Sequence, residues 1–143
     1  MANTAKPADF LDAHQRHWDD AEHLFQNERW ANADHLYGMA AECGLKRLMM
    51  RFGMDIHPTT GSPVVREDRN HANIIWARFE SYRSGRMEGV GYELPTNNPF
   101  SDWDVSDRYA PRSNFNQAEV QAHQAGAMVV CGLIKRAQRD GLL

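Results

Sequence analysis

Two arginines and a tyrosine lie close together in the segment WDVSDRYAPRSNF, residues 103–115. Arg108 and Arg112 carry guanidinium groups, which hold phosphate through paired hydrogen bonds, and the ring of Tyr109 can stack on a base. A helix is expected to begin just after Asn116, and the free N–H groups and positive dipole end of a helix start favour anions. Together these residues predict a site for a nucleotide or for the phosphates of RNA. In the structural alternative, Tyr109 closes one end of the fold and Arg108 pairs with a nearby aspartate.

Glu42 and Lys46 are four residues apart in a helical pattern, so their side chains lie on the same helix face. The favoured interpretation is a solvent-exposed ion pair worth roughly a few tenths of a kcal/mol. If the segment around Arg108 folds over this helix, Glu42 would instead orient an arginine and Lys46 would extend the phosphate site.

No metal site and no cofactor are expected from the sequence. Asp20-x-x-His23 and Asp68-x-x-His71 match the carboxylate–histidine pairs of metal-binding bundles only in part, since a dinuclear site also needs inward-facing glutamates. The chain has no glycine–lysine phosphate loop, no dinucleotide fingerprint and no nucleophile elbow. These observations give no support to nucleotide hydrolysis by those routes or to ordinary hydrolase chemistry.

Four amphipathic patterns separated by turn signals predict the elements that must position these residues. Helices are expected at about 9–26, 29–52, 68–84 and 117–139, with a long irregular loop at about 86–115. Gly53 marks the end of the second helix, and Asn116 followed three residues later by Glu119 forms a capping box at the start of the last. No strand alternation is sustained. The sequence therefore predicts an all-α fold, an antiparallel four- to five-helix bundle that spans residues 1–143 as a single domain.

Net charge and cysteine content limit the possible partners and the cellular location of the protein. The net charge of the 143 residues is −3 at pH 7, so any nucleic acid must be bound by a local basic patch. Cys43 and Cys131 lie in apolar helical patterns without metal-ligand spacing, which predicts buried free thiols of a reducing compartment. The first residues lack the apolar core of a signal peptide, and no stretch is long enough to span a membrane. A cytoplasmic protein without membrane contact is expected.

Two segments resemble the HEPN domains, a family of small helical proteins. These segments are ADHLYGMAAECGLKRLM, residues 33–49, and DRYAP, residues 107–111, which is followed by Phe115 before the last helix. The resemblance implies a HEPN-like bundle that binds a nucleotide or RNA, as part of a prokaryotic stress, defence or toxin–antitoxin type system. On this interpretation the ligand contacts are Arg108, Tyr109, Arg112, Lys46 and Glu42.

The same resemblance implies an enzymatic alternative, a metal-independent endoribonuclease. Ribonucleases of the family pair an arginine with a histidine four to six residues away, and the best candidates here are Arg66 and His71 at the entry to a predicted helix. His71 would be the general base for the ribose 2′-OH, and Arg66 would stabilise the pentacovalent phosphate. The last helix departs from the family pattern, because its single histidine, His123, has no arginine of the Arg108 segment at the required distance.

A third alternative is a non-catalytic helical interaction module, with a protein partner encoded by a neighbouring gene. A homodimer is also expected. The second predicted helix has a broad apolar face and the last has small residues at Ala122, Ala125 and Gly126, so together they offer more surface for burial than four helices need.

Overall fold

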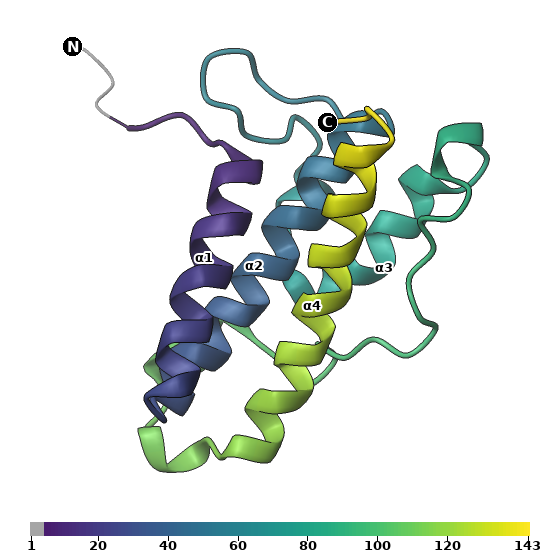
Figure 1. Ribbon diagram of the computed structural model, residues 1–143. Coiled ribbons are helices and arrows are strands. Elements are labelled where there is room, and N and C mark those ends of the chain that lie inside the picture. The colour runs from purple at the N-terminus through teal and green to yellow at the C-terminus, as the bar shows by residue number, and fades with distance from the viewer. Residues whose placement is uncertain (1–4) are drawn as a thin grey trace.

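The computed structural model describes residues 5–143, and these residues form a helical bundle (Figure 1). Its four α-helices are α1 (Phe10–Gln26), α2 (Trp30–Arg51), α3 (Ala72–Arg83) and α4 (Gln117–Arg139). Four short 3₁₀ turns lie between them, η1 (Arg66–Arg69), η2 (Met87–Gly89), η3 (Val105–Tyr109) and η4 (Arg112–Asn114). Within residues 5–143 no strand forms. The predicted all-α bundle is confirmed.

The central element is α2, which packs against α1, α3 and α4. Figure 1 shows α1 running antiparallel to α2, whereas α4 runs in the same direction as α2. The side-chain contacts agree, because Asp34 and Gly44 of α2 meet His123 and Val130 of α4 in the same order along both helices. The long connection between α2 and α4 permits this parallel pairing, which the sequence pattern did not indicate.

Two helix ends are where the turn chemistry predicts them. The last residue of α2 is followed by Phe52 and then by Gly53, whose φ of 109° is a conformation that glycine adopts easily. At the start of α4 the side chain of Asn116 accepts a hydrogen bond from the backbone N–H of Glu119, at 3.0 Å. These two signals fix the end of α2 and the start of α4.

The third helix begins four residues later than the sequence pattern indicates. Asp68 lies in η1, and its side chain is completely buried as an acceptor for Arg78, at 2.8 Å, and for the hydroxyl of Tyr82. Asn70 and His71 follow in extended conformations before α3 starts. The carboxylate therefore binds side chains about two and three turns into α3, and the expected boundary at residue 68 was wrong.

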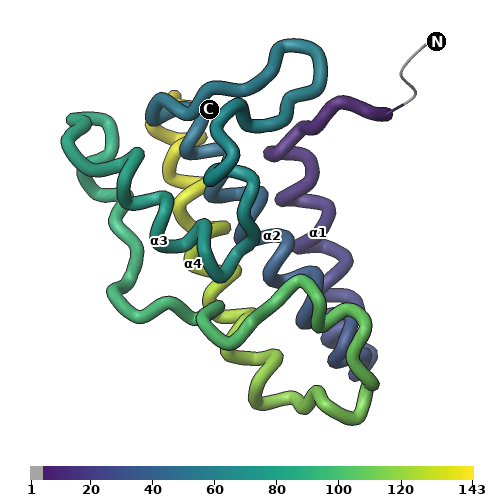
Figure 2. The backbone as a smooth tube through the Cα atoms, turned by 180° about the vertical axis from the view of Figure 1, so that it is seen from behind, coloured from purple at the N-terminus to yellow at the C-terminus, as the bar shows by residue number. Residues whose placement is uncertain are grey.

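The long loop between α3 and α4 is ordered by buried aromatic residues. Tyr92, Phe100 and Trp103 are all at most 1% exposed. The indole of Trp103 donates to the carbonyl oxygen of Asp34 and lies directly against Gly38, where any side chain would overlap the ring. Seen from behind in Figure 2, the later part of the loop crosses the lower ends of α1 and α2 before it enters α4.

Burial within the chain changes one argument for a dimer. Most of α2 is buried inside the bundle, including Ala40, Ala41 and Leu45, so its apolar face is already covered. On α4, Met128 and Val129 remain exposed. Homodimer formation thus stays a prediction, and of the two helices that suggested it only α4 leaves apolar surface open.

Both cysteines are free thiols, as the sequence predicts. Cys43 is buried and Cys131 is half-buried. Burial raises the pKa of Cys43 to about 12 and that of Cys131 to about 11.

No helix within residues 5–143 combines the length and the apolarity that crossing a bilayer requires.

Candidate functional site

Arg108 and Arg112 line one cavity of about 600 Å³, which we call the arginine pocket. Arg29, at the corner between α1 and α2, lines the same cavity. The loop of residues 104–114, called the arginine loop, forms the opposite wall. The remaining lining residues are Leu24, Glu28, Trp30, Ala31, Asn32, Asp107 and Ala110.

The first turn of α2 opens onto the arginine pocket without a cap. Arg29 occupies the N-cap position and makes no side-chain capping bond, and no acidic residue lies in the first turn. Trp30, Ala31 and Asn32 all line the cavity. Their backbone N–H groups and the positive end of the helix dipole therefore lie at a place where an anion would be stabilised.

None of the three arginines forms an ion pair within the described part of the chain. The alternative in which Arg108 pairs with a nearby aspartate is therefore wrong. Arg108 instead stacks on Tyr109, with 4.9 Å between the guanidinium carbon and the ring centroid. Tyr109 is 78% exposed and does not line the pocket, so it does not close the end of the bundle. Its ring remains accessible to a ligand that extends beyond the pocket.

The start of α4 does not contribute to the arginine pocket. Glu119 and Phe115 line a separate acidic cavity of about 250 Å³, together with Asp34, Asp102, Asp107, Ala110, Asn114 and His123. The helix start that faces the arginines is that of α2. The start of the last helix, after Asn116, had been expected from the sequence to take this place.

Glu42 and Lys46 form a buried ion pair, and the expectation of a solvent-exposed pair was wrong. Each residue is 4% exposed, and Lys46 Nζ lies 3.1 Å from Glu42 Oε2. The other carboxylate oxygen of Glu42 is 2.9 Å from Nδ1 of His71, the N-cap residue of α3. Lys46 Nζ also lies 5.8 Å from the ring centroid of Phe10. The helix face predicted to be solvated is covered by the start of α1 and by the entry to α3.

Two histidines beside this ion pair have buried ring nitrogens without a partner. Nδ1 of His17 and Nδ1 of His35 make no hydrogen bond within the described residues. Burial and the charge of Arg108 lower the pKa of His35, and burial, Arg16 and His35 lower that of His17. Both imidazoles are therefore neutral at pH 7.

The pKa of His71 is shifted in the opposite direction. Its hydrogen bond to Glu42 raises its pKa, against the effects of burial and of the cations Lys46 and Arg108. The charge of Arg108 lowers the pKa of both His35 and His71. We call His17, His35 and His71 the histidine cluster.

The structure does not bring Arg66 together with His71. Arg66 is exposed in η1 and lines a separate hollow of about 430 Å³ with Glu67, Arg69 and Asn70. No hydrogen bond joins Arg66 to His71 among residues 5–143. Arg108 is the arginine whose charge acts on His71.

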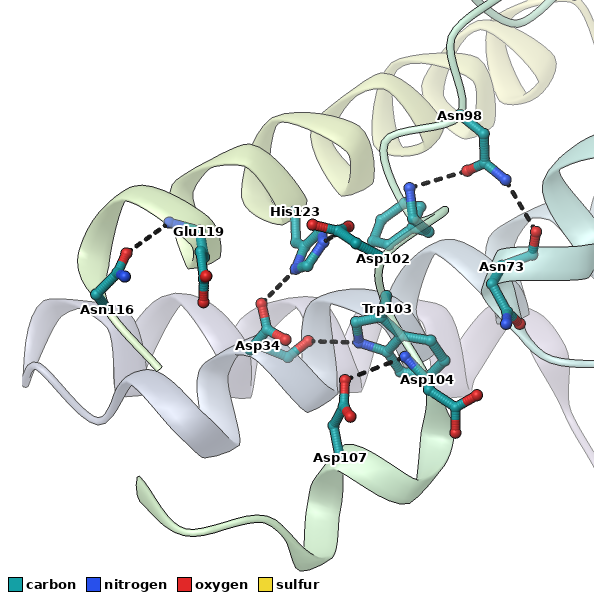
Figure 3. Close-up of polar contacts among 11 residues, drawn as sticks. Asp34, Asn73, Asn98, Asp102, Trp103, Asp104, Asp107, Asn116, Glu119 and His123 are labelled. Atoms are coloured by element: carbon teal, nitrogen blue, oxygen red, sulfur yellow. Dashed lines mark hydrogen bonds and ion pairs between the residues drawn. The ribbon is translucent and has the colours of Figure 1, made fainter. Parts of the chain in front are cut away.

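A second polar group ties the long loop to α2 (Figure 3). His123 of α4 is buried between two carboxylates: Nδ1 hydrogen-bonds Asp34, and Nε2 is 2.8 Å from Asp102 Oδ1. The ring of Phe100 stacks on the imidazole, with centroids 5.5 Å apart. Nothing in the sequence signals the two partners of His123, because Asp34 and Asp102 are distant from it in the chain.

Within residues 5–143, no group of three or more histidine, cysteine, aspartate or glutamate side chains is arranged to hold a metal ion. Comparison with known proteins adds no relative: no family model, no curated protein and no solved structure matches the chain. The chemistry of the site therefore has to be argued from its own residues.

Proposed function

We propose that the arginine pocket binds phosphate groups, and that the protein is a HEPN-like module for a nucleotide or RNA. The observation that carries this proposal is the meeting of three arginines at the uncapped start of α2, none of which forms an ion pair among residues 5–143. Guanidinium groups bind phosphate bidentately, and a helix start adds N–H donors and a positive dipole end. A cavity that concentrates unpaired cations in a protein of net charge −3 favours an anionic ligand.

The other walls of the pocket suit the rest of a nucleotide. Leu24 and Trp30 supply apolar surface, and the ring of Tyr109 beyond the rim can stack on a base. Glu28 and Asp107 line the same cavity and can accept hydrogen bonds from amino or hydroxyl groups. We expect the phosphates at the arginines and the base or ribose at these walls.

Titration with AMP, ATP and a short RNA at two salt concentrations tests this proposal. Because the binding energy comes from phosphate contacts, affinity should fall as salt rises, and ATP should bind more tightly than AMP. Arg29→Ala should weaken binding by about tenfold, since one charged hydrogen-bonding group is lost. Arg139→Ala, which removes an exposed arginine that is not part of the pocket, is the matched control. Equal affinity for both variants would refute the site.

The histidine cluster supports a second candidate function, a metal-independent endoribonuclease. Environments that push the pKa values of neighbouring groups apart can define a base and an acid. His35, with its lowered pKa, suits the general base for a ribose 2′-OH, and His71, with its raised pKa, suits the general acid for the leaving 5′-oxygen. Arg108 is the cation available to stabilise the pentacovalent phosphate, since Lys46 is buried and paired with Glu42. This arrangement replaces Arg66 by Arg108 and assigns His71 to the acid.

RNA cleavage in the presence of a chelator is the expected result for this candidate. His35→Gln should lower the rate by at least about a hundredfold, since loss of a general base has an effect of that order. The pH–rate profile should be bell-shaped, rising through the lowered pKa of His35 and falling through the raised pKa of His71. His57→Gln, at an exposed histidine of another loop, should leave the rate unchanged. An inert wild-type protein would remove the enzymatic candidate and leave the binding proposal intact.

A further inference from the structure

The side chain of His123 connects three parts of the fold that are distant in the chain. It projects from α4, hydrogen-bonds Asp34 on α2, and hydrogen-bonds Asp102 in the loop that leads into η3. His123 is 4% exposed and Asp34 2% exposed, whereas the Asp102 side chain is 73% exposed. The bond to Asp102 is therefore the accessible link of the three-residue chain in Figure 3.

The protonation state of His123 decides whether both links can exist at once. A protonated imidazole donates from both nitrogens, so it can hold two ionised carboxylates simultaneously. A neutral imidazole has one donor and one acceptor nitrogen, and the acceptor nitrogen would face a carboxylate oxygen without a proton between them. Loss of the proton therefore breaks one link and leaves a repulsive contact in its place.

Geometry favours release at Asp102 over release at Asp34. Asp34 is fixed on the central helix, and the indole N–H of Trp103 donates to its backbone oxygen at 3.0 Å. Asp102 lies on the loop and is mostly in water, so its carboxylate is solvated as soon as it leaves His123. Two residues after Asp102 the arginine loop begins, and it carries Arg108 and Arg112 to the pocket.

We infer that His123 is a proton-operated latch that holds the arginine loop in its binding conformation, so that anion binding at the arginine pocket weakens when His123 is deprotonated. This inference rests on the proposed function and adds its regulation by pH. The ionisable groups that face His123 are Asp34 from α2, Asp102 from the loop, and Asp107 and Glu119 across the acidic cavity. All four are acidic, so the surroundings on every side favour the charged form of the ring.

The direction of the pH effect follows from the same contacts. Burial opposes the charge of His123, but the hydrogen bonds and charges of Asp34 and Asp102 outweigh it and raise the pKa above the ordinary 6.5. A group whose pKa is raised on folding contributes fully below its unfolded value and loses its contribution as pH rises through the folded value. The latch is therefore closed below pH 6.5 and opens on the alkaline side of the raised pKa.

Amide hydrogen exchange of residues 98–112 tests the latch without a ligand. Wild type and Asp102→Ala, which removes the partner of His123 Nε2, are compared at the same pH, which cancels the intrinsic pH dependence of exchange. At pH 6 the wild-type loop should exchange about tenfold more slowly. On the alkaline side of the raised pKa of His123 the two proteins should exchange alike, because the latch is then open in both. Glu119→Gln removes the same charge from the acidic cavity without a hydrogen bond to His123 and should behave as wild type. If wild type and Asp102→Ala exchange alike at pH 6, or differ equally at both pH values, the inference is overturned.

Binding of a short oligoadenylate completes the test, because its phosphodiesters keep a constant charge between pH 6 and 9. Wild-type affinity should fall by about tenfold over this range, a typical size for coupling between two sites. Asp102→Ala should bind weakly at both pH values, with a change of less than about threefold. Binding that occurs with the same pH dependence in both proteins would reject the latch and leave the proposed function standing. No binding at any pH would reject the proposed function, and the exchange experiment would still decide the latch.

Discussion

Arg108→Ala is expected to lower the affinity of the protein for ATP by about 10- to 100-fold, because each hydrogen bond to a charged group is worth roughly 1.5–3 kcal/mol. Arg108 lines the arginine pocket, forms no ion pair with a residue in the described part of the chain, and is exposed, so its loss removes a ligand contact without opening the core. The thermal unfolding midpoint of the free variant should stay within about 2 °C of wild type, since surface substitutions change stability little.

Arg108→Lys is the informative companion to this variant. Lysine keeps the charge but cannot form the paired hydrogen bonds of a guanidinium group, so it should recover only part of the lost affinity. Calorimetric titration of ATP into the three proteins measures both effects. If Arg108→Ala binds ATP as tightly as wild type, phosphate does not bind at this arginine, and the pocket loses its proposed role.

Glu42→Ala is expected to destabilise the fold by about 3–5 kcal/mol, because it leaves the buried ammonium of Lys46 without its carboxylate. Both side chains are at least nine-tenths buried, so water cannot replace the lost partner. The hydrogen bond from His71 is lost at the same time, which releases the entry to α3. Chemical denaturation at pH 7 measures the free energy of unfolding.

Two further variants separate burial from charge in this measurement. Lys46→Met should cost less than Glu42→Ala, because the methionine fills the space and His71 remains a partner for Glu42. Glu88→Ala breaks the exposed ion pair with Arg51 and should cost at most about 1 kcal/mol. A loss for Glu42→Ala as small as that for Glu88→Ala would show that Glu42 and Lys46 are solvated in solution.

The sequence predicted the helices well because their signals are local. Amphipathic spacing fixed α1, α2 and α4 to within a residue or two, and Gly53 and Asn116 fixed two of their ends through backbone geometry. The start of α3 was misplaced because residues 66–69 form a 3₁₀ turn and Asn70 and His71 are extended, which the amphipathic pattern does not reveal.

The candidate site was predictable only in part, since pockets are made by residues that are distant in the chain. Arg108 and Arg112 were found because arginines close together in a loop are visible locally. Arg29 was missed because its role depends on which helix start faces the loop, and that requires the parallel packing of α2 and α4. One local signal was available: Arg29 precedes a helix whose first turn has neither a capping side chain nor an acidic residue.

Burial of the Glu42–Lys46 pair could likewise not be predicted from the sequence. Its spacing of four residues is that of a surface ion pair, and the charges themselves favoured exposure. Burial came from elements that the helical pattern does not contain, namely Phe10 at the start of α1 and His71 at the entry to α3. A buried charge pair can be recognised from sequence only when its covering segments are known.

Thermal unfolding with and without ATP would decide whether the arginine pocket is a phosphate site. Wild type is compared with a variant that carries Arg29→Ala, Arg108→Ala and Arg112→Ala together, at one low salt concentration. A ligand that binds only the folded state, at about a hundred times its dissociation constant, stabilises by roughly 2.7 kcal/mol. The wild-type midpoint should therefore rise by several degrees, and the midpoint of the triple variant should not move. An equal rise in both proteins, or no rise in wild type at saturating ATP, would contradict phosphate binding at these three arginines.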